Sequence, residues 1–117
     1  MKKIFIVLFF FIGVTLLYSH APSKVEIKYD AANNAINVYV KHSLKTSPIK
    51  DPTKHYVESI ELKVNGKLIT TNTFTKQETI DGQSTVFNNV DLKKGDKVSV
   101  KAECSIIGSK TSKIVIK

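Results

Sequence analysis

The sequence predicts an all-β fold, an immunoglobulin-like antiparallel β-sandwich of about seven strands. Short runs of residues alternate between apolar and polar, as half-buried strands do. Turn-forming residues separate these runs at close intervals, and no convincing helical pattern interrupts them. Beyond the first twenty residues, about 97 residues remain, which is enough for one small domain with a single core.

The first two predicted strands cover residues 24–29 and 36–41, where apolar and polar side chains alternate. A pair of asparagines, Asn33-Asn34, supplies the turn between them. The inward register of the second strand continues to His42. Residues 43–54 are polar and contain two prolines, which cannot donate to a sheet, so we expect a loop there.

The third predicted strand runs from residue 57 to 64 and ends at Asn65-Gly66, a strong two-residue hairpin signal. Its threonine-rich partner covers residues 67–74 and alternates less cleanly. The sequence therefore predicts a hairpin whose first strand begins directly after His55.

Three further strands complete the predicted sandwich. A short one at residues 85–87 follows the Asp81-Gly82 turn. The next, residues 98–104, places apolar residues and Cys104 in one register, and the last covers residues 113–116.

The N-terminal segment has the pattern of a secretory signal peptide. Two lysines precede an apolar run, residues 4–17, which is short for a membrane span. We expect residues 1–19 to be the signal peptide, with cleavage after Ala21 as an alternative, and residues 20–117 to form the domain. The protein would then be exported, periplasmic or secreted, with no membrane contact after cleavage. An uncleaved N-terminal anchor is the remaining alternative.

The composition excludes several functions. The chain has 18 basic residues against 10 acidic ones, and every basic residue is a lysine. Without arginine, bidentate recognition of phosphates or bases is not expected, so we predict no nucleic-acid partner. Many lysines fall at strand-alternating positions, as on a solvated sheet face. No Ser-His-Asp order, carboxylate pair or glycine-rich phosphate loop supports other enzyme chemistry.

Three residues with metal-binding side chains fall at predicted strand ends. His42 and Cys104 each end a strand in the inward register, and His55 immediately precedes one. If the three ends meet at one edge of the sandwich, two imidazoles and a thiolate converge, a set suited to a borderline or soft transition metal. The alternative is that the histidines are ordinary rim residues and the single cysteine is a small core hydrophobe.

Four segments together resemble a known family. They are His20-Ala21-Pro22, His42 at a strand end, Lys54–Leu62 (KHYVESIEL) and Glu103–Gly108 (ECSIIG). In this order they resemble the iron-binding domain of desulfoferrodoxin, the superoxide reductase family, over essentially the whole mature chain. The most specific piece is the His-Tyr-aliphatic-Glu-x-Ile-Glu-Leu run with its later Cys-x-x-x-Gly loop. The family fold is an immunoglobulin-like sandwich, in agreement with the strand prediction.

The resemblance implies a mononuclear non-haem iron held by four equatorial histidines and an axial cysteine thiolate. By position, His20, His42 and His55 match three of the histidines, and Cys104 matches the thiolate. The fourth histidine falls at Ile107, so the chain would be a divergent member without that ligand. The loop after His42 is also longer than the family's.

The implied activity is the one-electron reduction of superoxide to peroxide. An electron-donor protein would supply the electron. Superoxide would bind opposite the sulfur, and Lys54 matches the lysine that attracts this anion and helps to deliver protons. Where some members carry an acidic residue, this chain has Thr53. Lys54 could equally be one solvated lysine among many.

The missing histidine keeps other interpretations open. Three histidines and one cysteine can form a closed tetrahedral site, which suits zinc as well as iron. Two histidines and one cysteine are a copper-type set, although such sites place a histidine soon after the cysteine and none follows Cys104. The alternative function is a non-catalytic periplasmic or surface binding module, or a metal carrier, that has lost the reductase centre.

Overall fold

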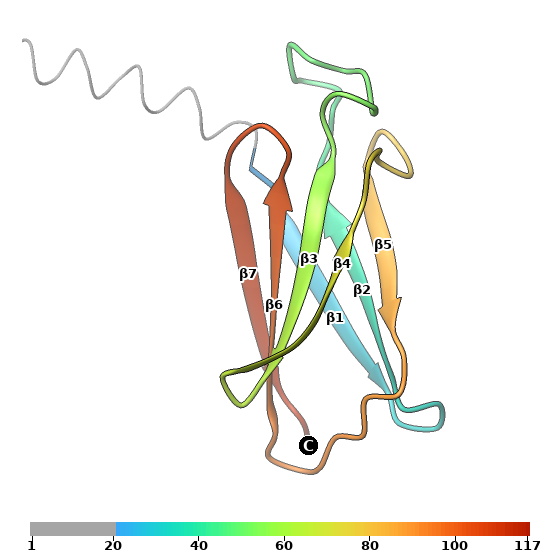
Figure 1. The fold of residues 1–117 in the computed structure, drawn as a ribbon, viewed down its shortest axis with the longest axis vertical. Helices are drawn as coiled ribbons and strands as arrows, with labels where there is room; N and C mark the ends of the chain where they lie inside the picture. Colours follow the sequence, from blue (N-terminus) through green and yellow to red (C-terminus); the bar gives the residue numbers. More distant parts are fainter. Residues whose placement is uncertain (1–20) are drawn as a thin grey trace, which may run out of the picture.

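The computed structural model describes residues 21–117, which form two packed β-sheets (Figure 1). The seven strands are β1 (Lys24–Asp30), β2 (Ala35–Lys41), β3 (Val57–Val64), β4 (Lys67–Thr73), β5 (Gly82–Phe87), β6 (Lys97–Cys104) and β7 (Ser109–Val115). The predicted all-β sandwich of about seven strands is therefore confirmed. The expected signal peptide, residues 1–19, and His20 lie outside the described residues. Between residues 21 and 117, no helix is long and apolar enough to cross a membrane.

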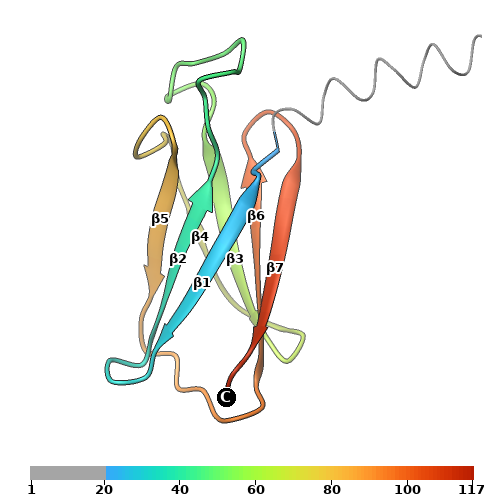
Figure 2. The same cartoon turned by 180° about the vertical axis from the view of Figure 1, so that it is seen from behind.

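The strands divide into a three-stranded sheet, β1-β2-β5, and a four-stranded sheet, β4-β3-β6-β7 (Figures 1 and 2). All neighbouring strands are antiparallel. Apolar side chains on the inner faces form one core, in which Ile36, Ile60 and Leu62 are fully buried. The outward positions between them are polar, as in immunoglobulin-like sandwiches.

The hairpin between β3 and β4 has the turn that its sequence predicts. Asn65 and Gly66 both have positive φ angles, 52° and 82°, as a type I′ turn requires. Strand β7 is longer than the predicted 113–116, because its pairing with β6 extends from Val115 back to Ser109. Residues 109–112 are polar throughout, which is tolerated on an edge strand and hides it from a search for alternation.

Strand β3 contains a bulge that the alternating pattern does not show. Val57, Ile60 and Leu62 are all buried, although Val57 and Ile60 are an odd number of residues apart. The pairing of β3 with β6 shifts between Val57 and Ser59, and this irregularity returns the side chains to the core face. As a result, Val57 pairs with Cys104 at the end of β6.

Three connections gather at one end of the sandwich, which is the upper end in Figure 1. They are the β2–β3 loop (residues 42–56), the β4–β5 loop (residues 74–81) and the β6–β7 turn (residues 105–108). Strands β2 and β6 finish at this end, and β3 begins there. The strand ends that carry His42, His55 and Cys104 are therefore neighbours in space.

Candidate metal centre

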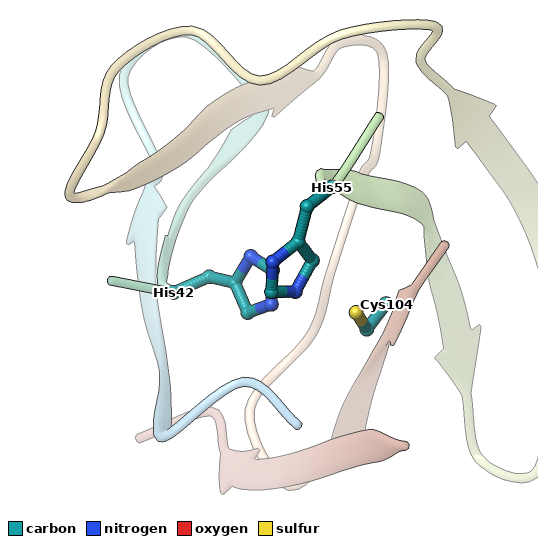
Figure 3. A group of neighbouring side chains, drawn as sticks. All are labelled: His42, His55 and Cys104. Carbon is teal, nitrogen blue, oxygen red and sulfur yellow. The ribbon is translucent and has the colours of Figure 1, made fainter. Parts of the chain in front are cut away.

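His42, His55 and Cys104 lie together in a buried cluster (Figure 3). One ligand atom from each residue lies within 4.8 Å of the others. Bonds of about 2.0 to 2.3 Å to one ion allow two ligands to be at most about 4.4 Å apart, so the cluster is close to the size that a single ion needs. The two imidazole rings meet edge to face, with centroids 4.7 Å apart.

The cluster joins the two sheets. His42 follows β2 of the three-stranded sheet, whereas His55 precedes β3 and Cys104 ends β6 in the four-stranded sheet. The exposed fractions of the three residues are 2%, 1% and 6%. Two imidazoles and a thiol that converge away from water are a donor set suited to zinc, copper or iron.

His42 is held by Gln77 of the β4–β5 loop. The Gln77 side-chain nitrogen donates to the carbonyl oxygens of His42 and Thr79, each at 2.8 Å. The other end of the amide, Oε1, lies 2.6 Å from Nδ1 of His42. Because this oxygen can only accept, Nδ1 carries a ring proton, and Nε2 is the nitrogen through which His42 would bind an ion.

His55 is held in the same way by its own loop. Its Nδ1 lies 3.0 Å from the carbonyl oxygen of Ile49 and 3.1 Å from the hydroxyl of buried Ser47. The Ile49 carbonyl cannot donate, so Nδ1 of His55 is also protonated and Nε2 carries the lone pair. Both imidazoles thus present the same nitrogen as a ligand.

A short turn delivers His55 to the cluster. The carboxylate of Asp51 accepts hydrogen bonds from the backbone nitrogen and the hydroxyl of Thr53, at 2.9 and 2.7 Å. These bonds, with the nearby charge of Lys54, hold the pKa of Asp51 below its ordinary value. The Asp51 carbonyl then accepts from the backbone nitrogen of His55 at 2.9 Å. The predicted loop at Pro52 is therefore an ordered turn.

The surroundings of Cys104 favour its thiolate. Burial is the largest influence on the pKa of Cys104 and raises it. Hydrogen bonds from the side chain of His42 and from the backbone amides of Ile106 and Ile107 act against burial, and together they bring this pKa below its ordinary value. The Ile106 nitrogen lies 3.4 Å from the sulfur. A thiolate is the form that binds metals.

The β6–β7 turn leaves no space for a side chain at Gly108, whose φ is +99°. Its carbonyl accepts from the backbone nitrogen of Cys104 at 2.9 Å. A Cβ at this position would lie 2.7 Å from the Cβ of Ala21. The first described residue is therefore packed against the turn that holds Cys104.

Two other positions that the sequence analysis singled out, Lys54 and Ile107, lie outside the buried cluster. Lys54 is exposed beside His55, and its assigned role in attracting superoxide stays a prediction. Ile107 is 43% exposed and offers only its backbone amide to Cys104. Sequence reasoning missed Gln77 and Ser47, because a polar residue in a polar loop carries no periodic signal.

Comparisons with known proteins bear on the fold of the chain. No family model matches the sequence, and no curated protein matches it. Among solved structures, a superoxide reductase (1Fe-SOR) from Giardia intestinalis is similar, with a TM-score of 0.56 and 16% identity over 85% of this chain and 99% of that chain. A superoxide reductase (neelaredoxin) from Ignicoccus hospitalis gives a TM-score of 0.51 and 17% identity over 89% and 86% of the two chains.

A hypothetical protein from Pyrococcus horikoshii OT3 is also similar, with a TM-score of 0.56 and 22% identity over 82% of this chain and 89% of that chain. At such identities the comparisons establish the fold. They confirm the resemblance drawn from the sequence at that level, and they cover most of the chain. Residues 21–117 therefore have the fold of the superoxide reductases, with His42, His55 and Cys104 gathered at one end of it.

Proposed function

We propose that this protein binds a single transition metal ion, with iron as the first candidate, through His42, His55 and Cys104. The observation that carries the proposal is the convergence of these three buried side chains from both sheets. Each imidazole donates its Nδ1 proton to a neutral acceptor, and an ion bound at Nε2 would leave that hydrogen bond intact. The lowered pKa of Cys104 makes its thiolate, which would be an anionic ligand, easier to form.

Elemental analysis of the mature protein, recovered anaerobically, tests this proposal. We expect about one metal ion per chain in the unmodified protein and none in a Cys104→Ala variant. Near-stoichiometric iron would support the reductase relationship, whereas stoichiometric zinc or copper would point to a carrier or a structural site. If the protein contains no metal and takes up none when iron, zinc or copper is offered, the proposal is wrong.

The number of ligands depends on the N-terminus. We propose His20 as a further ligand, because Ala21 is packed against Gly108 in the turn after Cys104. Cleavage before His20 would keep this ligand as the first residue of the mature chain. We also propose export of the chain, on the sequence of residues 1–19. Mass spectrometry of the mature N-terminus tests both ideas: cleavage after Ala21 would remove His20, and an intact Met1 would refute processing.

Reduction of superoxide to peroxide is the second proposed function, and the shared fold with two superoxide reductases supports it. When bound, an iron ion would supply the one-electron chemistry. Lys54, exposed beside His55, would attract the superoxide anion and help to deliver protons. An electron-donor protein would restore the reduced state.

Superoxide consumption by the iron-loaded protein tests this second function. A Lys54→Gln variant should react more slowly, and the loss should shrink as ionic strength rises. Lys50 provides a control, because it is exposed in the same loop and its side chain is engaged with the Ser47 carbonyl at 2.9 Å. Iron-loaded protein that consumes no superoxide would leave a metal carrier or a non-catalytic binding module, which the aliphatic side chain of Ile107 favours.

A further inference from the structure

Gln77 is buried, unlike its neighbours in the β4–β5 loop. Residues 75–81 are exposed except for Gln77, which is only 3% exposed. A glutamine is costly to bury unless its amide is hydrogen bonded. Here the side-chain amide bonds to His42 and to the Thr79 carbonyl of its own loop, and the backbone nitrogen donates to the Pro52 carbonyl at 2.9 Å. Burial of this one side chain therefore ties the β4–β5 loop to the end of β2.

The orientation of the Gln77 amide follows from its partners. The side-chain nitrogen lies 2.8 Å from two carbonyl oxygens, those of His42 and Thr79, which both require a donor. The oxygen must then be the atom that lies 2.6 Å from Nδ1 of His42. The amide thus contacts both the backbone and the ring of one residue, which fixes the position and the rotation of the imidazole together.

We propose that Gln77 is a positioning residue for the metal centre: it holds His42 with the proton on Nδ1 and so directs the Nε2 lone pair to the ion. For its effect on metal affinity, this inference rests on the proposed metal binding. The part of the inference that concerns the proton on Nδ1 of His42 does not depend on metal binding. Partners of this kind fix the tautomer of a histidine ligand, and their loss typically lowers metal affinity about 10- to 100-fold.

Two substitutions separate positioning of the ring from simple support of the loop. Gln77→Met has a similar length but removes the acceptor and the donors. Gln77→Glu removes the donors to the two carbonyl oxygens and keeps an acceptor for Nδ1. If Gln77 only supports the loop, the two variants should behave alike. If it positions His42, Gln77→Glu should keep the tautomer that Gln77→Met loses.

Gln83 offers a matched control. It is also a buried glutamine, 7% exposed, and its amide accepts from the Glu78 nitrogen and donates to the Ser84 carbonyl, each at 2.9 Å. Its amide therefore stabilises the same loop through hydrogen bonds that do not involve a histidine. A Gln83→Met variant should lose loop contacts while the His42 ring keeps its proton on Nδ1.

The experiment uses the mature chain. Nitrogen NMR of the metal-free protein reports which nitrogen of His42 carries the proton, and competition titration with zinc then gives the affinity. We expect a proton on Nδ1 in the unmodified protein, in Gln77→Glu and in Gln83→Met. In Gln77→Met we expect a mixture of tautomers and a zinc affinity about 10- to 100-fold lower.

A His42 ring whose Nδ1 carries no proton in the unmodified protein overturns the inference, whether or not any variant folds. Equal tautomers and equal zinc affinities in Gln77→Met and the unmodified protein overturn it as well, and so does a Gln77→Glu variant with the tautomer mixture of Gln77→Met. If the unmodified protein binds no zinc, iron or copper, the proposed function fails, and the tautomer measurement still decides the role of Gln77.

Discussion

Replacing Cys104 with alanine should abolish the increase in melting temperature that a bound metal ion gives. The metal-free fold should remain largely intact. The substitution deletes one heavy atom from a residue that is 6% exposed. Loss of one buried atom of this size costs about 1 kcal/mol in the free energy of unfolding. For a domain of about 100 residues, that cost lowers the melting temperature by about 4 to 8 °C. The metal-free variant should therefore still melt cooperatively.

A bound metal ion should raise the melting temperature of the unmodified protein, because it binds the folded state and not the unfolded state. A ligand that binds only the folded state adds about 2.7 kcal/mol when its free concentration is 100 times its dissociation constant. With the same conversion, the unmodified protein should melt about 10 to 20 °C higher in saturating zinc. Cys104→Ala should show almost none of this increase, because the remaining imidazoles lack the anionic ligand.

Calorimetry with and without zinc measures both quantities. Val100→Ala is a matched control, since Val100 is fully buried in β6, pairs with Leu62 and is not one of the three cluster residues. This control should melt at a lower temperature than the unmodified protein and should keep the full increase with zinc. A Cys104→Ala variant that retains the increase would refute the thiolate as a ligand.

Four further outcomes are expected. Ile107→His should raise the metal affinity in a competition titration, because it adds an imidazole beside Cys104; an unchanged affinity would mean that this position does not face the ion. His20→Ala should lower the affinity of protein whose mature N-terminus retains that residue, and equal affinities would remove His20 from the ligand set. Gly108→Ala should lower the free energy of unfolding in urea by about 1 to 3 kcal/mol, since its φ is +99° and its Cβ would crowd the N-terminal segment; no loss of stability would contradict that packing. His42→Phe should raise the pKa of the Cys104 thiol, followed by thiolate absorbance in metal-free protein, and an unchanged pKa would contradict the His42 hydrogen bond.

The pKa of Cys104 also links the stability of the metal-free fold to pH. Its pKa in the folded chain lies below its ordinary value, so the thiolate stabilises the fold above the unfolded pKa. This contribution is lost as the pH falls through the lowered folded pKa. The difference in stability between the unmodified protein and Cys104→Ala should therefore shrink toward acidic pH.

Strand periodicity was sufficient to predict most of this fold. The alternation in β2 and β6 is read directly from the sequence, and Asn65-Gly66 marks its hairpin. Two details escape such reasoning for physical reasons. The bulge at Val57–Ser59 is set by pairing with β6, and the polar start of β7 is held by its neighbour and not by burial.

The candidate site was predictable only in part. His42 and Cys104 were found because a ligand-type residue in an inward strand register is unusual, and the structure places both in the buried cluster with His55. Their supporting residues were not found. Gln77 and Ser47 come from irregular loops, where the burial of a side chain depends on how distant segments fold back.

The position of the cluster explains how a bound metal ion could stabilise the whole sandwich. His42 extends one sheet, and His55 and Cys104 extend the other. A sandwich of this kind is held together mainly by apolar packing between its layers, which fades toward the ends where the loops begin. Ligands from both layers on one ion would join the sheets where this packing is weakest. The same end carries the β6–β7 turn against Ala21, the β4–β5 loop with Gln77 and the β2–β3 loop with His55, so the conformations of these three connections and the geometry of the cluster depend on one another.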